Sequence, residues 1–232
     1  MIQRNKKKGD QTASLSGSPT LSQNLLPIEL PRPAIAHGKS ILKALQQRKT
    51  IREIRDKKLP LQLLSVLLWT ACGVNRKKGP FDIPGRTAAS ASNSQEIDLY
   101  VALQEGIYFY DAFHQRLVPV IAGDLRALAI GPGQVNFAAK APLHFIYIAD
   151  IHKLTHTSGY QEPGLQDSEI QKSYYYVDTG IIAGNVYLFA ASQDLACWFH
   201  NCNKSGLREK LQLRPDQRVL FAQTVGYPVK KY

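Results

Sequence analysis

The chain has 232 residues, of which 44% are hydrophobic, so its size and apolar content suit one large globular domain with a core of its own. Its formal net charge of +11 suggests an anionic partner such as nucleic acid, a membrane surface or a phosphorylated cofactor. Its three cysteines, Cys72, Cys197 and Cys202, are too few and too unevenly spaced for a disulfide framework, and they fit a reducing compartment.

Residues 1–36 are rich in Ser, Pro, Lys and Gln, a composition typical of a mobile tail. The basic start is followed by the polar segment 11–18, which argues against a secretory signal peptide. The most apolar run, residues 180–191, is too short for a membrane span and contains Asn185. We therefore expect a mobile basic, Pro-rich tail over 1–36, a folded domain over 37–232, a cytoplasmic location and no membrane partner.

Two helices are predicted after the tail. The first covers about 39–47, with Ser40 as its N-cap. Its apolar face carries Ile41, Leu42 and Leu45. The second starts near Pro60, which suits a first helical turn, and runs to about Cys72. This second helix is apolar nearly all round, which indicates a buried helix.

The remaining elements alternate between strands and helices. Short apolar runs and alternating patterns predict strands at 97–103, 107–110, 117–121, 143–149, 196–199 and 218–226. Helices are predicted at 124–130, 168–192 and from a Ser205 cap to 211, with loops at 75–85 and 152–166. Gly180 and Gly184 lie four residues apart on one face of the long helix and permit close helix contact. The mixture indicates an α+β fold.

A basic cluster, Arg48-Lys49-Thr50-Ile51-Arg52, follows the first helix. Arginine offers a planar fork of donors, lysine a point charge and threonine a hydroxyl, and together they can hold a phosphate. A solvated basic turn has the same pattern, because charge runs are usually exposed. The cluster alone leaves both interpretations open.

The small polar loop before the first long strand carries Ser90, Ser92, Asn93 and Gln95. Its hydroxyls, amides and nearly bare backbone can approach a flat heteroaromatic ligand and hydrogen-bond its edge, although an ordinary irregular loop has the same composition. The loop and the basic cluster are separated by one buried helix. The loop and the basic cluster together fit a single ligand that has a phosphate tail and a polar ring, as FMN does.

Other candidate sites have weaker patterns. His152 and His156 share a helical spacing without a third metal ligand nearby, and Cys197, His200 and Cys202 lack the second half of a zinc site. No dinucleotide-binding, P-loop or nucleic-acid-binding motif occurs, so we expect neither a metal nor a nucleic-acid partner. The run 174–176 of three tyrosines suits helix packing, a subunit interface or, as a minority interpretation, a flavin contact.

In combination, four motifs resemble the FMN-dependent nitroreductase superfamily. In chain order they are Arg48-Lys49-Thr50-Ile51-Arg52, the segment 89–95, the Asp-x-Gly and Asn-x-x-Leu-x-Ala patterns of 178–192, and Gly226-Tyr227-Pro228. Segments 69–76 and 86–90 are similar to one branch, the azoline-oxidising dehydrogenases of peptide-modification pathways and their stand-alone relatives. Lys49, Thr50 and Ala89 replace the Arg, Ser and Pro that are common in the superfamily.

The resemblance implies a three-layer nitroreductase-like fold, with a mostly antiparallel central sheet flanked by helices, in an intertwined homodimer with FMN at its interface. Arg48, Lys49 and Thr50 would hold the phosphate and ribityl end, and Arg52 would approach the N1/O2 edge of the ring. The loop residues would line the ring or the partner's share of the pocket: Ser90, Ser92, Asn93 and Gln95. No side chain of the protein is implied as a catalytic residue, because the flavin performs the redox step.

The implied activity is NADH- or NADPH-driven hydride transfer to a small acceptor such as a nitroaromatic or a quinone. Two alternatives remain open. The flavin could instead oxidise thiazoline or oxazoline rings in a peptide. A non-enzymatic protein that binds anions or nucleic acid would also explain the positive charge.

Overall fold

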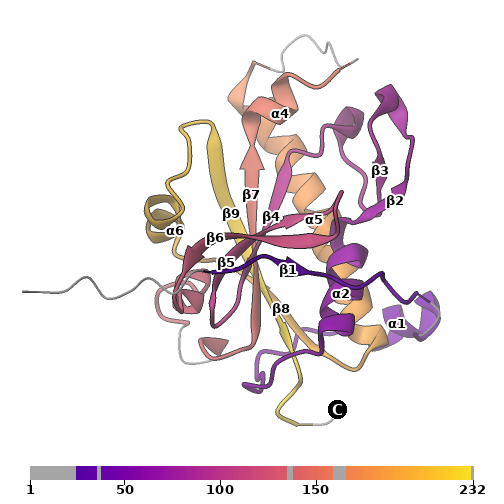
Figure 1. The fold of residues 1–232 in the computed structure, drawn as a ribbon, viewed down its shortest axis with the longest axis vertical. Coiled ribbons are helices and arrows are strands. Elements are labelled where there is room, and N and C mark those ends of the chain that lie inside the picture. The colour runs from indigo at the N-terminus through magenta and orange to yellow at the C-terminus, as the bar shows by residue number, and fades with distance from the viewer. Residues whose placement is uncertain (1–24, 36–37, 135–137, 159–165, 231–232) are drawn as a thin grey trace, which may run out of the picture.

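The computed structural model describes residues 25–35, 38–134, 138–158 and 166–230. A seven-stranded sheet forms its centre, with the strand order β1-β6-β5-β4-β7-β9-β8 and every neighbouring pair antiparallel (Figure 1). The strands are β1 (Ile28–Glu29), β4 (Ile97–Ala102), β5 (Gly106–Asp111), β6 (Arg116–Ala122), β7 (Leu143–Asp150), β8 (Ala196–His200) and β9 (Gln217–Gly226). The predicted α+β class with a mostly antiparallel sheet is therefore confirmed.

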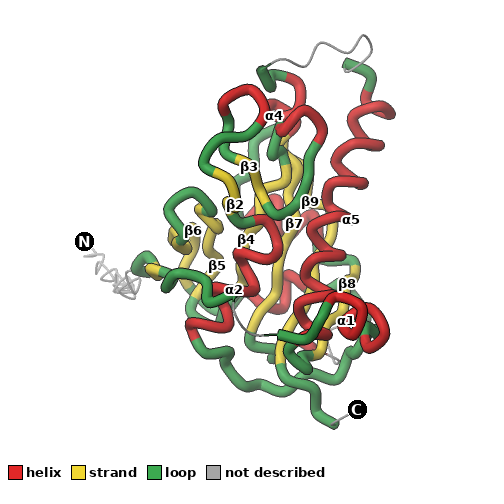
Figure 2. The backbone as a smooth tube through the Cα atoms, turned by 90° about the vertical axis from the view of Figure 1, so that its right-hand side faces the viewer, coloured by secondary structure: helices red, strands yellow, loops and turns green. Residues whose placement is uncertain are grey.

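Helices cover both faces of the sheet. On one face lie α1 (Ile41–Gln47), α2 (Leu61–Cys72) and the long α5 (Ser168–Ser192), which crosses the sheet lengthwise in Figure 2. On the other lie α6 (Lys204–Lys210) and the short 3-10 helix η3 (Arg126–Ala129). The helix α4 (Ile151–Thr155) follows β7 directly, and a separate ribbon pairs β2 (Val74–Arg76) with β3 (Gly85–Arg86). No helix in the described ranges is long and apolar enough to cross a bilayer.

Strand β7 runs through the core, and every one of its residues is buried. Successive side chains of a strand point to opposite faces, so one strand feeds two separate clusters. Phe145 and Tyr147 pack in the cluster beneath α2 and α5, while Ile146 and Ile148 pack beneath α6. Both helical layers are therefore anchored on the same central strand.

The predicted tail over 1–36 contains an ordered segment. Its residues 25–35 cross the edge of the sheet, where β1 pairs with β6 through Ile28 opposite Leu117, and Leu30 is buried in the core. Residues 1–24 lie outside the described part. The ordered segment was missed because its pairing partner is far away in the sequence, and an edge strand can recruit a very short apolar segment.

Other differences from the predicted elements are local. The segment 75–85 contains the β2–β3 ribbon, and the segment 152–166 begins within α4, which Asp150 caps. The last helix begins at Lys204, and its N-cap is Asn203, two residues before the predicted cap Ser205, because the side chain of Asn203 accepts the Gly206 N–H. The predicted helix at 124–130 is the single 3-10 turn η3.

Helix α1 places the basic cluster at its C-terminal end. The Ser40 side chain caps its first turn by accepting the Lys43 N–H at 3.3 Å, and the Arg48 N–H closes its last turn on Ala44 O at 2.8 Å. Only Ala44 of this helix is buried. The cap therefore matters for a helix that has little packing of its own.

We expect Ser40→Ala to lower the free energy of unfolding by about 1 kcal/mol, because it removes the acceptor of an N-terminal N–H group. Urea unfolding followed by circular dichroism measures the loss. Ser205→Ala is the matched control, since Asn203 rather than Ser205 caps α6, and we expect it to stay within about 0.5 kcal/mol of the unchanged chain. Equal losses in both variants would contradict the assigned cap.

Candidate functional site

A basic groove of about 760 Å³ opens beside the end of α1. Four cationic side chains line it, Arg48, Lys49, Arg55 and Lys57, whereas Asp194 is the one acid among its lining residues. Asp194 already forms an ion pair with Lys39. Because the cations outnumber the acid, the groove attracts anions.

The basic segment is fixed along the edge of the sheet. The Ile51 N–H donates to Cys197 O of the edge strand β8 at 3.0 Å, and the Arg55 N–H donates to Tyr227 O at 2.8 Å. Ile54 is buried against Gly226, whose position leaves no space for a Cβ. The cations of the groove are thus held by backbone contacts on a rigid element.

Tyr187 of α5 joins the basic segment to the long helix. Its hydroxyl lies 3.2 Å from the Thr50 hydroxyl and accepts the Phe199 N–H at 2.9 Å, and the Arg48 guanidinium lies 5.4 Å from its ring centroid. Sequence analysis did not single out Tyr187. The sequence feature that could have indicated it is a tyrosine hydroxyl in a mainly apolar stretch of the long helix.

Arg52 lies on the other side of the edge strand. Its guanidinium lies 5.7 Å from the ring centroid of Trp198 on β8. Neighbouring residues of a strand point to opposite faces, so Trp198 and Phe199 lie on different sides of β8. Thr50 contacts Tyr187 of α5, which also binds the backbone of β8 at Phe199, whereas Trp198 packs with Ile54 and Ile130 in a separate cluster. The structure thus separates Arg52 from Arg48 and Thr50, and the family resemblance also implies a different role for Arg52.

The loop at 90–95 has an unusual backbone. Ser92, Asn93 and Gln95 have positive φ angles of 48°, 55° and 51°, a region that residues other than glycine adopt at a cost. The turn is closed by the Ser90 hydroxyl, which accepts the Gln95 N–H at 3.0 Å. Strain of this kind clusters at functional sites, so the loop is a credible binding element.

The amide side chains of the loop are used within it. The Gln95 amide donates to Pro84 O at 2.7 Å and to the Asn93 side chain at 2.9 Å, and its carbonyl accepts from Arg86. The Asn93 amide donates to Ile83 O at 3.2 Å. Both side chains therefore shape the loop, as the Ser90 hydroxyl does in part by accepting the Gln95 N–H. The backbone, the Ser92 hydroxyl and the hydrogen of the Ser90 hydroxyl remain to approach a ligand.

Helix α5 connects the two predicted halves of the site. Its Asp178 accepts the Ala91 N–H of the loop at 3.0 Å, while its Tyr187 contacts Thr50 of the basic segment. Nine residues of helix separate these contacts, which corresponds to about 14 Å along the helix axis. Within the chain the loop and the basic segment are thus attached to different parts of the same helix.

An apolar surface on α5 and α1 has no partner within the described chain. On α5, Val177 is 60% exposed and Ile181 38% exposed, and the space beside Gly180 and Gly184 is open. On α1 the exposed apolar side chains are Ile41, Leu42 and Leu45. This surface, which we call the α1–α5 face, is of the kind that marks an interaction site.

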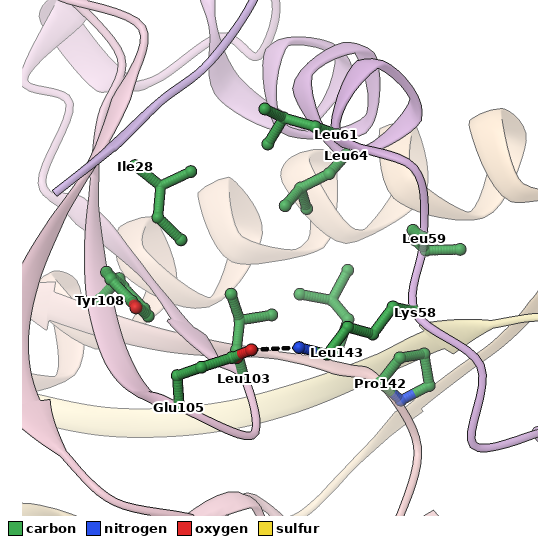
Figure 3. Close-up of a pocket in the computed structure, with 10 residues that line it drawn as sticks. All are labelled: Ile28, Lys58, Leu59, Leu61, Leu64, Leu103, Glu105, Tyr108, Pro142 and Leu143. Atoms are coloured by element: carbon green, nitrogen blue, oxygen red, sulfur yellow. Dashed lines mark hydrogen bonds and ion pairs between the residues drawn. The ribbon is translucent and has the colours of Figure 1, made fainter. Parts of the chain in front are cut away.

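A second cavity, of about 240 Å³, lies under the start of α2 (Figure 3). Leu61 and Leu64 of α2, Ile28 of β1 and Leu143 of β7 point into it, and the Lys58–Glu105 ion pair closes part of its rim. Its one lysine is thus already paired with an acid. The cavity is suited to apolar groups and offers no cluster of cations for a phosphate.

The histidines named as metal candidates have other partners. His152 and His156 stack at 4.0 Å between ring centroids, and His200 hydrogen-bonds to Thr224 and to Asn201 O. Burial lowers the pKa of His200, so it stays neutral near pH 7. No group of three residues suited to a metal occurs in the described ranges.

Comparisons with known proteins agree on one family. The description "Nitroreductase family" matches residues 45–227. A protein of Ralstonia eutropha JMP134 assigned as a nitroreductase is structurally similar, with a TM-score of 0.77 and 30% identity over 95% of this chain and 98% of that chain. The assigned nitroreductase MJ1384 of Methanocaldococcus jannaschii is 28% identical over 158 residues, or 65% of this chain and 73% of the relative. A Clostridium acetobutylicum protein assigned as an NADH oxidase shares the fold at 21% identity, with a TM-score of 0.52 over 82% of this chain and 87% of that chain.

Proposed function

Because the chain belongs to the nitroreductase family, a family of oxidoreductases, we propose that it is an FMN-dependent oxidoreductase that takes its electrons from NADH or NADPH. The observation that carries the proposal is the basic groove, which lies at the position of the family's first motif and is fixed to the sheet edge by backbone hydrogen bonds. The nitroreductase-like neighbours support the oxidoreductase class.

The chemistry of the groove fits a phosphate group. A phosphate monoester carries nearly two negative charges at neutral pH and accepts several charge-assisted hydrogen bonds. Of the predicted donors, Arg48 and Lys49 line the groove, and Arg55 and Lys57 add two further cations. Thr50 follows Lys49 directly in the chain, and its hydroxyl contacts Tyr187. We propose that these side chains hold the phosphate and ribityl end of FMN.

The loop at 90–95 fits the edge of the flavin ring. Its strained backbone and the Ser90 and Ser92 hydroxyls can approach a flat ring closely, while Asn93 and Gln95 keep the loop in shape. Arg52 is exposed, with its guanidinium 5.7 Å from the Trp198 ring centroid, and its approach to the N1/O2 edge of the ring stays a prediction. When bound, FMN supplies the ring nitrogen that accepts and passes on a hydride.

We further propose that the chain forms a homodimer through the α1–α5 face and that the site is completed across the two protomers. In one protomer the loop and the groove contact α5 about 14 Å apart. Gly180 and Gly184 leave space for the close approach of a second helix. A second copy would cover the exposed apolar side chains and could bring its own loop to the groove.

The proposed acceptor is a small electron-poor molecule such as a nitroaromatic or a quinone. Hydride transfer needs donor and acceptor to contact the same ring in turn, so the site must open to solvent between the two steps. The alternative is a dehydrogenase that oxidises thiazoline or oxazoline rings in peptides, and the two differ in the direction of electron flow. Reduction by a nicotinamide therefore separates them.

Purified protein is expected to be yellow and to release flavin absorbance on denaturation. We expect this absorbance to bleach under anaerobic conditions when NADH or NADPH is added, and to return when a quinone follows. A yellow protein that neither nucleotide bleaches would favour the azoline-oxidising alternative. A colourless protein that takes up no added FMN and binds nucleic acid with steep salt dependence would refute the flavin proposal.

A further inference from the structure

Two buried carboxyl groups face each other behind the loop at 90–95. Glu96 precedes β4 and has no solvent exposure, and Asp178 lies on α5 and is 5% exposed. They bind opposite ends of the same short turn, since Asp178 accepts from Ala91 and Glu96 accepts from Ser94, and each carboxyl influences the pKa of the other. Two ionised carboxylates that interact in a buried environment repel strongly, so one of them must hold a proton.

The hydrogen bonds of the pair lead to the same conclusion. One Glu96 oxygen, Oε2, accepts from the Ser94 hydroxyl at 2.6 Å, and Asp178 Oδ2 accepts the Ala91 N–H at 3.0 Å. The other Glu96 oxygen, Oε1, is buried without a donor among the described residues. A buried acceptor without a donor is costly, and a proton between the two carboxyls supplies the missing donor.

We propose that Glu96 and Asp178 share one proton and act as positioning residues that hold the loop at 90–95 in its flavin-binding shape. This inference rests on the proposed function, because it assigns a device to the same site. The shared proton links Glu96, at the start of β4, to Asp178 on α5. Asp178 binds Ala91 on one side of the turn, and Glu96 binds Ser94 on the other side. When the proton leaves to water, two negative charges remain side by side and push the loop away from α5.

The backbone strain of the loop explains why it needs the hydrogen bonds to Glu96 and Asp178. Two of the three loop residues with positive φ angles, Ser92 and Asn93, lie between the two attached residues, and the third, Gln95, follows them directly. A strained turn persists only where its surroundings determine it fully. A cavity of about 20 Å³, lined in part by Asp178, Ser90 and Gln95, has room for one water molecule and offers a route for the proton.

Other charged groups around the pair have partners of their own. Arg86 of β3 donates to Gln95 and to Cys72 O of α2. On the remaining elements, Asp98 of β4 pairs with Lys153 of α4, Asp150 of β7 pairs with Arg214, and burial raises the pKa values of Cys72 and of Tyr175 on α5. The largest influences on the Glu96 carboxyl are its burial and then the Asp178 carboxylate.

These two influences raise the pKa of Glu96 from 4.5 to about 8, and burial raises the pKa of Asp178. Between pH 4.5 and about pH 8 the folded chain therefore binds a proton that the unfolded chain has released. The resulting contribution to stability is fully present below pH 4.5 and is lost as the pH rises through about 8. Above this pH both carboxyls are charged, and the fold is less stable than it would be if one of the two side chains were uncharged.

Glu96→Gln tests the pair directly, because the amide can donate to Asp178 at every pH and still accept from Ser94. The first readout is the thermal midpoint of the FMN-free protein from pH 6 to pH 9. We expect the midpoint of the unchanged chain to fall relative to the variant by about 5 °C over this range. The second readout is the FMN dissociation constant from pH 7 to pH 9, where we expect about tenfold weakening in the unchanged chain and constancy in Glu96→Gln.

Glu105→Gln is the matched control. Glu105 is partly exposed, and its hydrogen bond with Lys58 lowers its pKa, so its charge does not change above pH 6. We expect this control to follow the pH profile of the unchanged chain in both readouts. Asp178→Asn repeats the test from the other carboxyl if Glu96→Gln fails to fold. Infrared spectroscopy of the unchanged chain, in which a protonated-carboxyl band should disappear between pH 7 and pH 9, needs no variant.

Parallel thermal profiles of the unchanged chain and Glu96→Gln, or no pH-sensitive carboxyl band, would overturn the shared proton. A difference in thermal midpoint together with pH-independent FMN affinity in both proteins would overturn the positioning role. Failure of the proposed function has another signature, because a protein that binds no FMN still shows the thermal difference. The two conclusions can therefore fail separately.

Discussion

Arg48→Ala is expected to weaken FMN binding by roughly 10- to 100-fold, because a hydrogen bond to a charged group contributes about 1.5–3 kcal/mol. Arg48 is the C-terminal cap of α1 and lies over the Tyr187 ring, so its guanidinium is held at the groove by both elements. Flavin fluorescence titration measures the dissociation constant. The loss should shrink at high salt, since a phosphate contact is electrostatic.

Two controls separate this effect from general loss of charge or fold. Arg218→Ala removes an exposed arginine of β9, which hydrogen-bonds to Pro215 O, and His152→Ala removes an exposed side chain of α4. Neither residue lines the groove. Each control should keep the FMN affinity of the unchanged chain, and equal affinities in Arg48→Ala and these controls would refute the proposed phosphate site.

Ile181→Glu should convert a dimer into a monomer. If the α1–α5 face is the dimer interface, the variant buries an unpaired charge beside Gly180 and Gly184, which costs about 3–5 kcal/mol. The dimer dissociation constant should rise at least about 100-fold. Light scattering coupled to size-exclusion chromatography measures this change, and FMN affinity should fall with it because the proposed site needs both protomers.

Val120→Glu is the matched control for the interface. Val120 on β6 is 42% exposed and Ile181 is 38% exposed, so both substitutions place a glutamate at a similarly exposed apolar position. Only the Val120 variant should remain a dimer with unchanged FMN affinity. A monomeric unchanged chain, or an Ile181→Glu dimer as tight as the unchanged one, would contradict the proposed interface.

Helix α5 contributes to every part of the proposed mechanism. Its Asp178 holds the loop, its Tyr187 contacts Thr50, and its two glycines leave space on the exposed face. Asn185 lies between these contacts, and its amide is 3.4 Å from both Ala71 O and Thr87 O. A change in how α5 packs would therefore affect loop, groove and interface together.

The sequence predicted most of the secondary structure because local patterns determine it. The long helix was predicted at 168–192, as observed, and Ser40 was named as the cap that begins α1. Two of the differences have clear physical causes. The 25–35 segment depends on β6, a pairing between distant residues, and the start of α6 depends on a cap formed by Asn203 rather than Ser205.

The sequence by itself determined the α+β class, the family motifs and the residue types that can hold a phosphate. Only the tertiary structure decided how those residues are grouped. Thr50 and Arg52 are two positions apart in the sequence, but they lie on opposite sides of β8 because successive side chains of that strand point to opposite faces. The path of the chain also brings Tyr187 to the basic segment and Asp178 to Glu96. Periodicity and capping act between neighbours in the chain, whereas a site depends on contacts between distant residues that burial and hydrogen bonding select.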